Sequence, residues 1–84
     1  MSEGAWWVYI IECDDGALYT GITTDLLRRW SQHNQGKGAK YFRTRKPKAF
    51  VYQEACSNRS EASRREYQIK QLSRKEKLCL IKRT

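Results

Sequence analysis

The first hydrophobic segment, residues 6–13, is apolar at both its odd and its even positions. A strand that is hydrophobic on both faces belongs in the middle of a sheet, where neighbouring elements cover each face. Polar residues at 14–16 then interrupt the pattern, which resumes over residues 17–22. Two apolar runs separated by a short polar loop that contains glycine predict a β-hairpin.

The length of the hairpin loop decides which side chains share a face. A three-residue loop with Gly16 in the left-handed conformation is a common closure, and it pairs Ile11 with Tyr19 and Tyr9 with Gly21. Tyr9 and Tyr19 would then be diagonal neighbours on one face, with backbones about 7 Å apart. A two-residue loop would place them on opposite faces, so we expect the three-residue form.

The hairpin is followed by a helical pattern. We expect Thr23 or Thr24 to cap this helix, which runs to about Asn34,. Arg29 and His33 are four residues apart and therefore lie on one side of it. The residues expected on its apolar stripe are Leu26, Leu27 and Trp30.

The second half of the chain predicts a loop over residues 35–48, a third strand over residues 49–55, and two helices. Capping-box patterns at 58–61 and 73–76 open these helices,. The expected inward side chains are Ala62, Glu66 and Ile69 on the first of these helices, with Ser73 as a further candidate, and Leu78 and Ile81 on the second. The order β-β-α-β-α-α predicts a single α+β domain over residues 1–84, with a small central three-stranded sheet flanked by helices.

Charge indicates the class of partner. Seventeen Lys and Arg residues oppose nine Asp and Glu residues, which gives a net charge of +8 on 84 residues. Such an excess favours nucleic acid first and an acidic membrane second, although a solvated basic surface is the alternative. No helix combines a broad apolar face with a basic face strongly enough to favour a membrane.

The predicted loop concentrates this charge and contains no acidic residue. It is the expected surface for the nucleic-acid backbone, because cationic side chains bind phosphates without reading sequence. Tyr41 or Phe42 would either stack on an unpaired base or pack beneath the loop. The expected nucleic-acid-binding residues are Lys37, Lys40, Tyr41, Arg43, Arg45, Lys46 and Lys48.

Cys13, Cys56 and Cys79 form no CxxC pair and are odd in number, so we expect three reduced thiols,. The longest apolar run is too short to span a bilayer, and no secretory signal pattern opens the sequence. These features predict a cytoplasmic location.

Several of these residues together resemble a known family. Val8-Tyr9-Ile10 followed by Tyr19-Thr20-Gly21 is similar to the paired motifs of the GIY-YIG nuclease superfamily, and Arg29, His33 and Glu66 follow in matching order. Residues 36–41 and 64–67 resemble segments of its small single-domain bacterial branch. Trp7, Val8 and Thr20 depart from the name-giving residues, but at positions that pack the hairpin. A late asparagine and an additional DNA-binding domain, found in some members, have no clear counterpart.

The resemblance implies a metal-dependent endonuclease that hydrolyses DNA phosphodiester bonds and serves DNA repair or recombination. It assigns Tyr9 as general base and Tyr19 as the residue that positions the water or the phosphate. Phosphodiester hydrolysis needs a nucleophilic water and stabilisation of charge on the phosphoryl oxygens. Arg29 has the planar fork that binds phosphate oxygens, and Glu66 supplies the oxygen ligand that Mg²⁺ or Mn²⁺ requires.

Each of these candidate catalytic residues also has an ordinary structural explanation. The two tyrosines could be core residues of an aromatic-rich hairpin, and Arg29 could be a surface arginine. Glu66 could form a salt bridge with Arg65, Lys70 or Arg29. His33 would either relay a proton or contact phosphate, or would lie exposed at the helix end, and Lys40 would clamp a phosphate or accept a proton.

Nothing in the chain resembles a recognition helix, so we expect selectivity for DNA structure or for single strands over sequence. The residues alone leave RNA open as a substrate, and a protein partner could supply specificity. A non-catalytic basic nucleic-acid-binding module with a nuclease-like fold is the alternative function.

Overall fold

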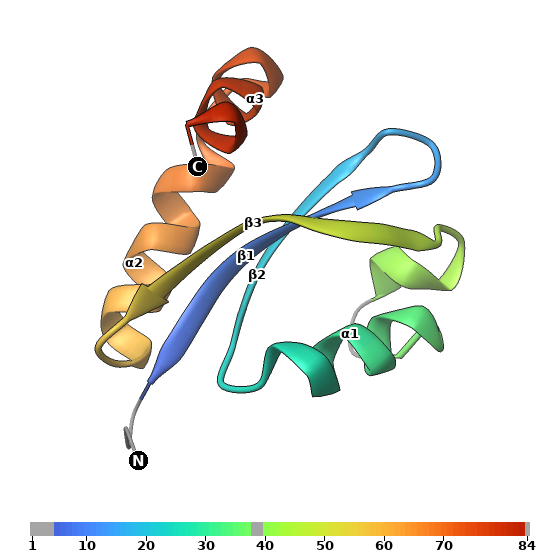
Figure 1. Cartoon of the computed structure of the whole chain (residues 1–84), viewed down its shortest axis with the longest axis horizontal. Coiled ribbons are helices and arrows are strands. Elements are labelled where there is room, and N and C mark those ends of the chain that lie inside the picture. The colour runs from blue at the N-terminus through green and yellow to red at the C-terminus, as the bar shows by residue number, and fades with distance from the viewer. Residues whose placement is uncertain (1–4, 38–39, 84) are drawn as a thin grey trace.

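The computed structural model describes residues 5–37 and 40–83, and Figure 1 shows the arrangement of its elements. In chain order these are β1 (Trp6–Cys13), β2 (Leu18–Thr23), α1 (Leu26–Asn34), the 3₁₀ helix η1 (Lys40–Arg43), β3 (Pro47–Cys56), α2 (Arg59–Lys70) and α3 (Arg74–Lys82). The predicted α+β class and the order β-β-α-β-α-α are confirmed. The structure adds η1 within the predicted loop.

The three strands form one antiparallel sheet in the order β2-β1-β3, so the doubly apolar segment is the central strand, as its pattern predicts. The hairpin closes through the three-residue loop. Cys13 N–H donates to the Ala17 carbonyl at 2.9 Å, and Gly16 has a φ of +86°. Ile11 therefore faces Tyr19, and Tyr9 faces Gly21, in the predicted register.

The two faces of the sheet carry different kinds of core. On one face, aliphatic side chains of β1 pack against α2, with Val8, Ile10, Ala62 and Ile69 all buried. On the other face the core is aromatic and lies under α1 and η1. Its buried members are Tyr9, Ile11, Cys13 and Phe42, with Tyr19, Leu26, Trp30, Tyr41 and Phe50 packed around them.

Helix α1 begins with Asp25 as its N-cap, so the expectation that Thr23 or Thr24 caps it was wrong. The Asp25 carboxylate accepts a hydrogen bond from Arg28 N–H at 3.0 Å. The Thr23 hydroxyl is engaged in the preceding turn, where it accepts from Asp25 N–H at 3.1 Å and donates to the Asp25 carbonyl at 3.2 Å. A carboxylate is also the stronger acceptor for a helix N-terminus.

Two hydrophobic side chains point away from the positions expected for them. Leu27 is 82% exposed instead of lying on the α1 stripe, and Leu78 is 39% exposed on α3. Leu80 and Ile81 pack against the aliphatic core instead of Leu78. Strand β3 is longer at both ends than expected, because its pairing with β1 extends to Pro47 at one end and Cys56 at the other.

The caps of the last two helices agree with the sequence patterns in most respects. Ser73 and Glu76 form the complete capping box of α3, which leaves Ser73 exposed and outside the inward stripe of α2. Asn58 caps α2 by accepting from Glu61 N–H at 2.8 Å. The Glu61 carboxylate, however, accepts from Ser57 N–H at 2.7 Å instead of from the cap residue, so the reciprocal bond is displaced by one residue.

The cap of α1 gives a first prediction. Replacing Asp25 by Ala should lower the free energy of unfolding by about 1 kcal/mol, because the amide of Arg28 loses its acceptor. Thr24→Ala is the matched control and should change stability by less than about 0.5 kcal/mol, as for most exposed substitutions. Urea unfolding followed by circular dichroism measures both, and equal effects of the two variants would contradict the assignment of the cap.

Candidate active site

Tyr9 and Tyr19 lie on the same face of the hairpin, with ring centroids 6.3 Å apart. Tyr9 is 1% exposed, whereas Tyr19 is only partly buried. Burial raises the pKa of both hydroxyls; Tyr19 adds to this effect on the pKa of Tyr9. Both phenols are therefore protonated at neutral pH, and neither is a ready-made phenolate.

His33 is buried beneath this pair, so the expectation of an exposed histidine at the helix end does not hold. It is 1% exposed, and its Nε2 lies 2.8 Å from the Tyr9 hydroxyl oxygen. The rings of Tyr19 and Phe42 surround it, with centroids 5.4 and 4.3 Å away. The imidazole thus joins α1 to the central strand through the aromatic core.

The surroundings of His33 favour its neutral form. Burial lowers its pKa, and the positive charge of Arg29 acts in the same direction, while the backbone of Lys37 favours the charged form. Nδ1 makes no hydrogen bond with the part of the chain that the structure describes. A neutral ring that carries its proton on Nδ1 can accept the Tyr9 hydroxyl proton at Nε2.

Gly21 is a residue of the site to which sequence reasoning gave no role. A Cβ at this position would lie 2.5 Å from the Tyr9 hydroxyl oxygen, 2.7 Å from Cζ of that ring and 3.1 Å from Cε2 of Tyr19. Any larger residue would thus displace both rings. The cross-strand pairing of Gly21 with Tyr9 in the predicted register is the signal that could have revealed this role.

Arg29 is a residue of α1 that lies within electrostatic reach of the same two phenols. Its charge lowers the pKa of Tyr9 and of Tyr19, although burial outweighs it. Its Nε atom is buried without a hydrogen-bond partner among the described residues, and no carboxylate in that part of the chain forms an ion pair with it. A buried donor without a partner is uncommon and indicates a group available for a ligand.

Glu66 approaches from α2, on the other side of the sheet. Its negative charge raises the pKa of both Tyr9 and Tyr19, so it lies within electrostatic reach of the two phenols around the edge strand β2. Its Oε2 is 3.2 Å from Nζ of Lys70, and its side chain is 24% exposed. The predicted alternative of a salt bridge therefore holds, with Lys70 as the partner, at a residue whose charge also acts on the tyrosines.

The chemistry of the donor set at Glu66 fits a single hard divalent cation. No group of three or more His, Cys, Asp or Glu side chains that could hold a metal occurs in the described ranges. Mg²⁺, however, keeps several waters and binds proteins through one or two carboxylates together with substrate phosphates. Glu66 supplies one such carboxylate, and its partial exposure allows a bound ion to keep waters.

The basic segment after α1 is divided between packing and surface. Phe42 is 3% exposed and belongs to the core, which leaves it no role in stacking on a base. The Tyr41 ring is partly buried against Tyr19, with centroids 5.1 Å apart. Arg45 lies over the Tyr41 ring and pairs with Asp15 at 2.8 Å. The remaining expected cations, Lys37, Lys40, Arg43, Lys46 and Lys48, are exposed.

Comparison with known proteins agrees with this geometry. Residues 5–78 match the model of the GIY-YIG catalytic domain. The chain belongs to the GIY-YIG family. GIY-YIG domains are generally metal-dependent endonucleases, and membership of the family implies a nuclease-like fold and a nucleic-acid substrate.

Similar proteins of the GIY-YIG family occur in bacteria and archaea. A UPF0213 protein of Desulfotalea psychrophila is 58% identical over 79 residues, covering 93% of this chain and 72% of that protein. One of Halobacterium salinarum is 56% identical over 74 residues, covering 88% and 96%. The solution NMR structure of a UPF0213 protein from Bacillus halodurans is 49% identical, with a TM-score of 0.60, and covers 93% of this chain and 83% of that one.

Among the described residues, no helix has the length and apolar character needed to cross a membrane. Cys13, Cys56 and Cys79 are free thiols, as expected.

The Gly21 contacts lead to a second prediction. Gly21→Ala should lower the free energy of unfolding by about 1–3 kcal/mol, because the added methyl group overpacks the ring of Tyr9. Combining it with Tyr9→Phe removes the shortest of these contacts, so the double variant should lose less stability than the sum of the single variants. Urea unfolding of the three variants measures this coupling, and strict additivity would argue against the contact.

His33 gives a third prediction. As the only histidine in the chain, it can be titrated alone by NMR of its imidazole, and its pKa should lie below the ordinary value of 6.5. Between the folded and unfolded pKa values the unfolded chain binds more protons, so stability should fall as the pH drops through that interval. A His33→Gln variant should lack this component. A measured pKa at or above 6.5 would contradict the neutral imidazole.

Proposed function

We propose that this protein is a metal-dependent endonuclease that hydrolyses phosphodiester bonds in DNA by direct attack of water. The observation that carries the proposal is the hydrogen bond between the Tyr9 hydroxyl and His33 Nε2, at 2.8 Å. It joins a tyrosine that can take a proton from water to an imidazole that can accept the tyrosine's own proton. The charges of Arg29 and Glu66 act on the same phenol.

The proton path follows from this pair. As the water oxygen forms its bond to phosphorus, its proton passes to the Tyr9 oxygen, and the Tyr9 proton passes to His33 Nε2. Tyr9 thus never needs to exist as a free phenolate, which its raised pKa would oppose. One ester P–O bond breaks, and the leaving oxygen takes a proton from solvent water. His33 then releases its extra proton to solvent, and the products are a phosphate monoester and an alcohol.

Arg29 and Tyr19 hold the phosphate in this proposal. A guanidinium binds two phosphoryl oxygens through parallel hydrogen bonds and stabilises the negative charge that develops on them. Tyr19 is partly exposed beside Tyr9, and its hydroxyl can donate to a phosphoryl oxygen or to the attacking water. Both groups fix the reacting atoms in line, which accounts for much of phosphoryl-transfer catalysis.

Glu66 would hold the divalent ion, Mg²⁺ or Mn²⁺. When bound, such an ion neutralises charge on the phosphoryl and leaving oxygens. Lys70 must release the Glu66 carboxylate for this to occur. Its ammonium group then becomes free to face the substrate backbone, and its charge already acts on Tyr19, whose pKa it lowers.

The exposed cations Lys37, Lys40, Arg43, Lys46 and Lys48 would follow the nucleic-acid backbone next to the site,. Contacts with phosphates alone select for shape or single-strandedness over sequence, which suits a role in DNA repair or recombination. We favour DNA over RNA on the family resemblance. Three free thiols agree with a reducing compartment such as the cytoplasm,.

A second candidate function, a nucleic-acid-binding module without catalysis, is favoured by two observations on the proposed catalytic groups. Tyr9 is 1% exposed, and Glu66 is engaged with Lys70, so two of the proposed catalytic groups are occupied before substrate binds. In this case the phosphate would rest on Arg29 and Tyr19 without reaction.

Cleavage assays distinguish the two functions. Labelled single-stranded, flapped, branched and duplex DNA should be cut in the presence of Mg²⁺ or Mn²⁺ and left intact with EDTA. Tyr9→Phe, Arg29→Ala and Glu66→Gln should each lower kcat by about 10²- to 10⁴-fold. Tyr67→Phe and Arg74→Ala are matched controls on exposed residues and should retain activity.

The outcome of these assays decides between the candidates. Salt-sensitive binding without cleavage of any substrate would establish the binding module. Cleavage that survives all three substitutions would show that the reaction occurs elsewhere on the protein or by contamination.

A further inference from the structure

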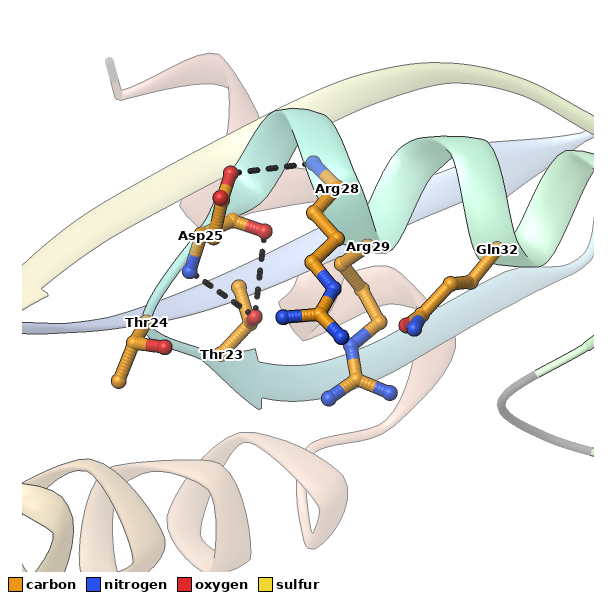
Figure 2. Close-up of a pocket in the computed structure, with 6 residues that line it drawn as sticks. All are labelled: Thr23, Thr24, Asp25, Arg28, Arg29 and Gln32. Atoms are coloured by element: carbon orange, nitrogen blue, oxygen red, sulfur yellow. Dashed lines mark hydrogen bonds between the residues drawn. The ribbon is translucent and has the colours of Figure 1, made fainter.

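A polar pocket of about 310 Å³ adjoins the candidate active site at the start of α1 (Figure 2). Figure 2 shows the side chains of Arg28 and Arg29 projecting from α1 toward β2, with Gln32 one turn further along the helix. The lining residues are Thr23, Thr24, Asp25, Arg28, Arg29 and Gln32. All are polar or charged, and Arg29 is shared with the site of the two tyrosines.

The charge of the pocket matches a monoanion. Arg28 and Arg29 contribute two guanidinium groups, and within the described ranges neither forms an ion pair with a carboxylate. Asp25 contributes the one opposing carboxylate, which is held at the rim by its hydrogen bond to Arg28 N–H. Two positive charges against one negative charge leave a net positive pocket, and a phosphodiester carries one negative charge.

The N-terminus of α1 is not itself the basis of this site, because the Asp25 carboxylate already accepts the hydrogen bond of the Arg28 amide there. The positive groups are the two adjacent guanidiniums. Both arginines line the pocket, so a phosphate placed between them can gain charge-assisted hydrogen bonds from each,. The buried, unpartnered Nε of Arg29 is an independent sign that this arginine is available to an acceptor, and Arg28 is the exposed cation beside it on α1.

We propose that this pocket binds the phosphodiester next to the one that is cleaved, with Arg28 as its main ligand. The inference rests on the proposed function for the identity of the neighbouring phosphate. Arg29 contacts both phosphates, while Gln32 and Thr24 can hydrogen-bond to the sugar-phosphate unit. The volume is close to the lower end of the usual range for ligand sites, about 300 Å³, which fits one such unit.

This subsite sets the direction in which the strand crosses the protein. The pocket offers no ring on which a base could stack, because no aromatic side chain lines it,. Arg28 is therefore a positioning residue: it aligns the substrate without touching the reacting atoms. Its effect should appear in affinity and salt dependence, and in KM more than in kcat.

Binding measurements in EDTA test the subsite separately from cleavage. Fluorescence anisotropy with labelled single-stranded and branched oligonucleotides should show Arg28→Gln binding about five- to tenfold more weakly than wild type at low salt. The slope of log K against log salt should fall by about 0.7–1 for the lost contact. Circular dichroism and thermal unfolding check that the helix is intact.

Arg74→Gln is the matched control. It removes the same charge from an exposed arginine whose guanidinium lies near Gly16, at the hairpin tip, since a Cβ there would be 3.9 Å from Nη2. The pocket lies at the opposite end of β2, beside Thr23. Equal losses of affinity for the two variants would reduce Arg28 to one more surface charge and overturn the proposal.

A substrate with a neutral methylphosphonate locates the contact. One neutral linkage is placed in turn on each side of the scissile phosphate, and at one of these positions wild type should lose affinity while Arg28→Gln loses nothing further. Full additivity at every position would exclude the subsite. Competition with inorganic phosphate at matched ionic strength tests for a free anion, and Arg28-dependent displacement by millimolar phosphate would assign the pocket to that ion instead.

These results separate the subsite from the enzyme. Arg28-dependent binding without cleavage in Mg²⁺ would support the pocket as a backbone-binding site and reject the nuclease. Cleavage of DNA by a protein whose affinity for DNA does not depend on Arg28 would support the nuclease and reject the pocket as a backbone-binding site. Absence of any binding to DNA would overturn both.

Discussion

The hydrogen bond between Tyr9 and His33 is the interaction on which the functional half of the molecule depends. It lies inside an aromatic core, where an unsatisfied hydroxyl or imidazole would cost about 1–3 kcal/mol. Because Tyr9 belongs to the central strand and His33 to α1, the bond fixes the helix against the sheet. Arg29 lies one turn before His33 on the same side of the helix, so the bond also sets where its guanidinium meets the phenols.

The hairpin could be predicted from sequence because its determinants are local. A doubly apolar strand, a three-residue polar loop and the permissive backbone of Gly16 together allow one register. That register already places Tyr9 opposite Gly21 and Tyr19 on the same face. The order of the helices and their approximate ends follow from equally local patterns, as the capping box at Ser73 illustrates.

The features that escaped prediction depend on contacts between distant segments. His33 resembles a solvated residue at a helix end, and its burial follows from the arrival of Phe42 and Tyr19 around it. Leu27 fits an apolar stripe, yet α1 turns its Leu26 and Trp30 side toward the sheet and leaves Leu27 exposed. The helix pattern alone does not state which of two adjacent apolar faces is covered.

Gly21 illustrates a different limit of prediction from sequence. Its backbone is not in the left-handed region, so no turn rule requires glycine, and in sequence it looks like a weak position within a strand. The requirement comes from the neighbouring ring, which occupies the space of a side chain. A glycine with no chemistry of its own can thus be needed because it leaves room for the ring of a neighbouring side chain, here Tyr9.

The positive charges show what the structure adds to the net charge given by composition. The net charge of +8 is a property of the whole chain, but individual cations differ in what they already bind. Arg45 is paired with Asp15, and Arg65 holds Glu54 against Tyr52, whereas Arg28 and Arg29 have no carboxylate partner in the ranges described. The uncompensated positive charge that acts on both tyrosines is therefore that of Arg29, which Arg28 precedes on α1.

Lys70 lies between these two kinds of cation, because it is paired with Glu66 but the pair is weak. Its lysine side chain is 52% exposed, and ion pairs of adjacent helical turns contribute only about 0.3–0.5 kcal/mol. A divalent ion or a phosphate can therefore separate the two charges at small cost. While it lasts, the pair keeps a carboxylate at the edge of a cationic site without a strong penalty. In the proposed mechanism, where Glu66 holds a divalent ion beside a bound polyanion, a lysine partner that is easily displaced suits this carboxylate.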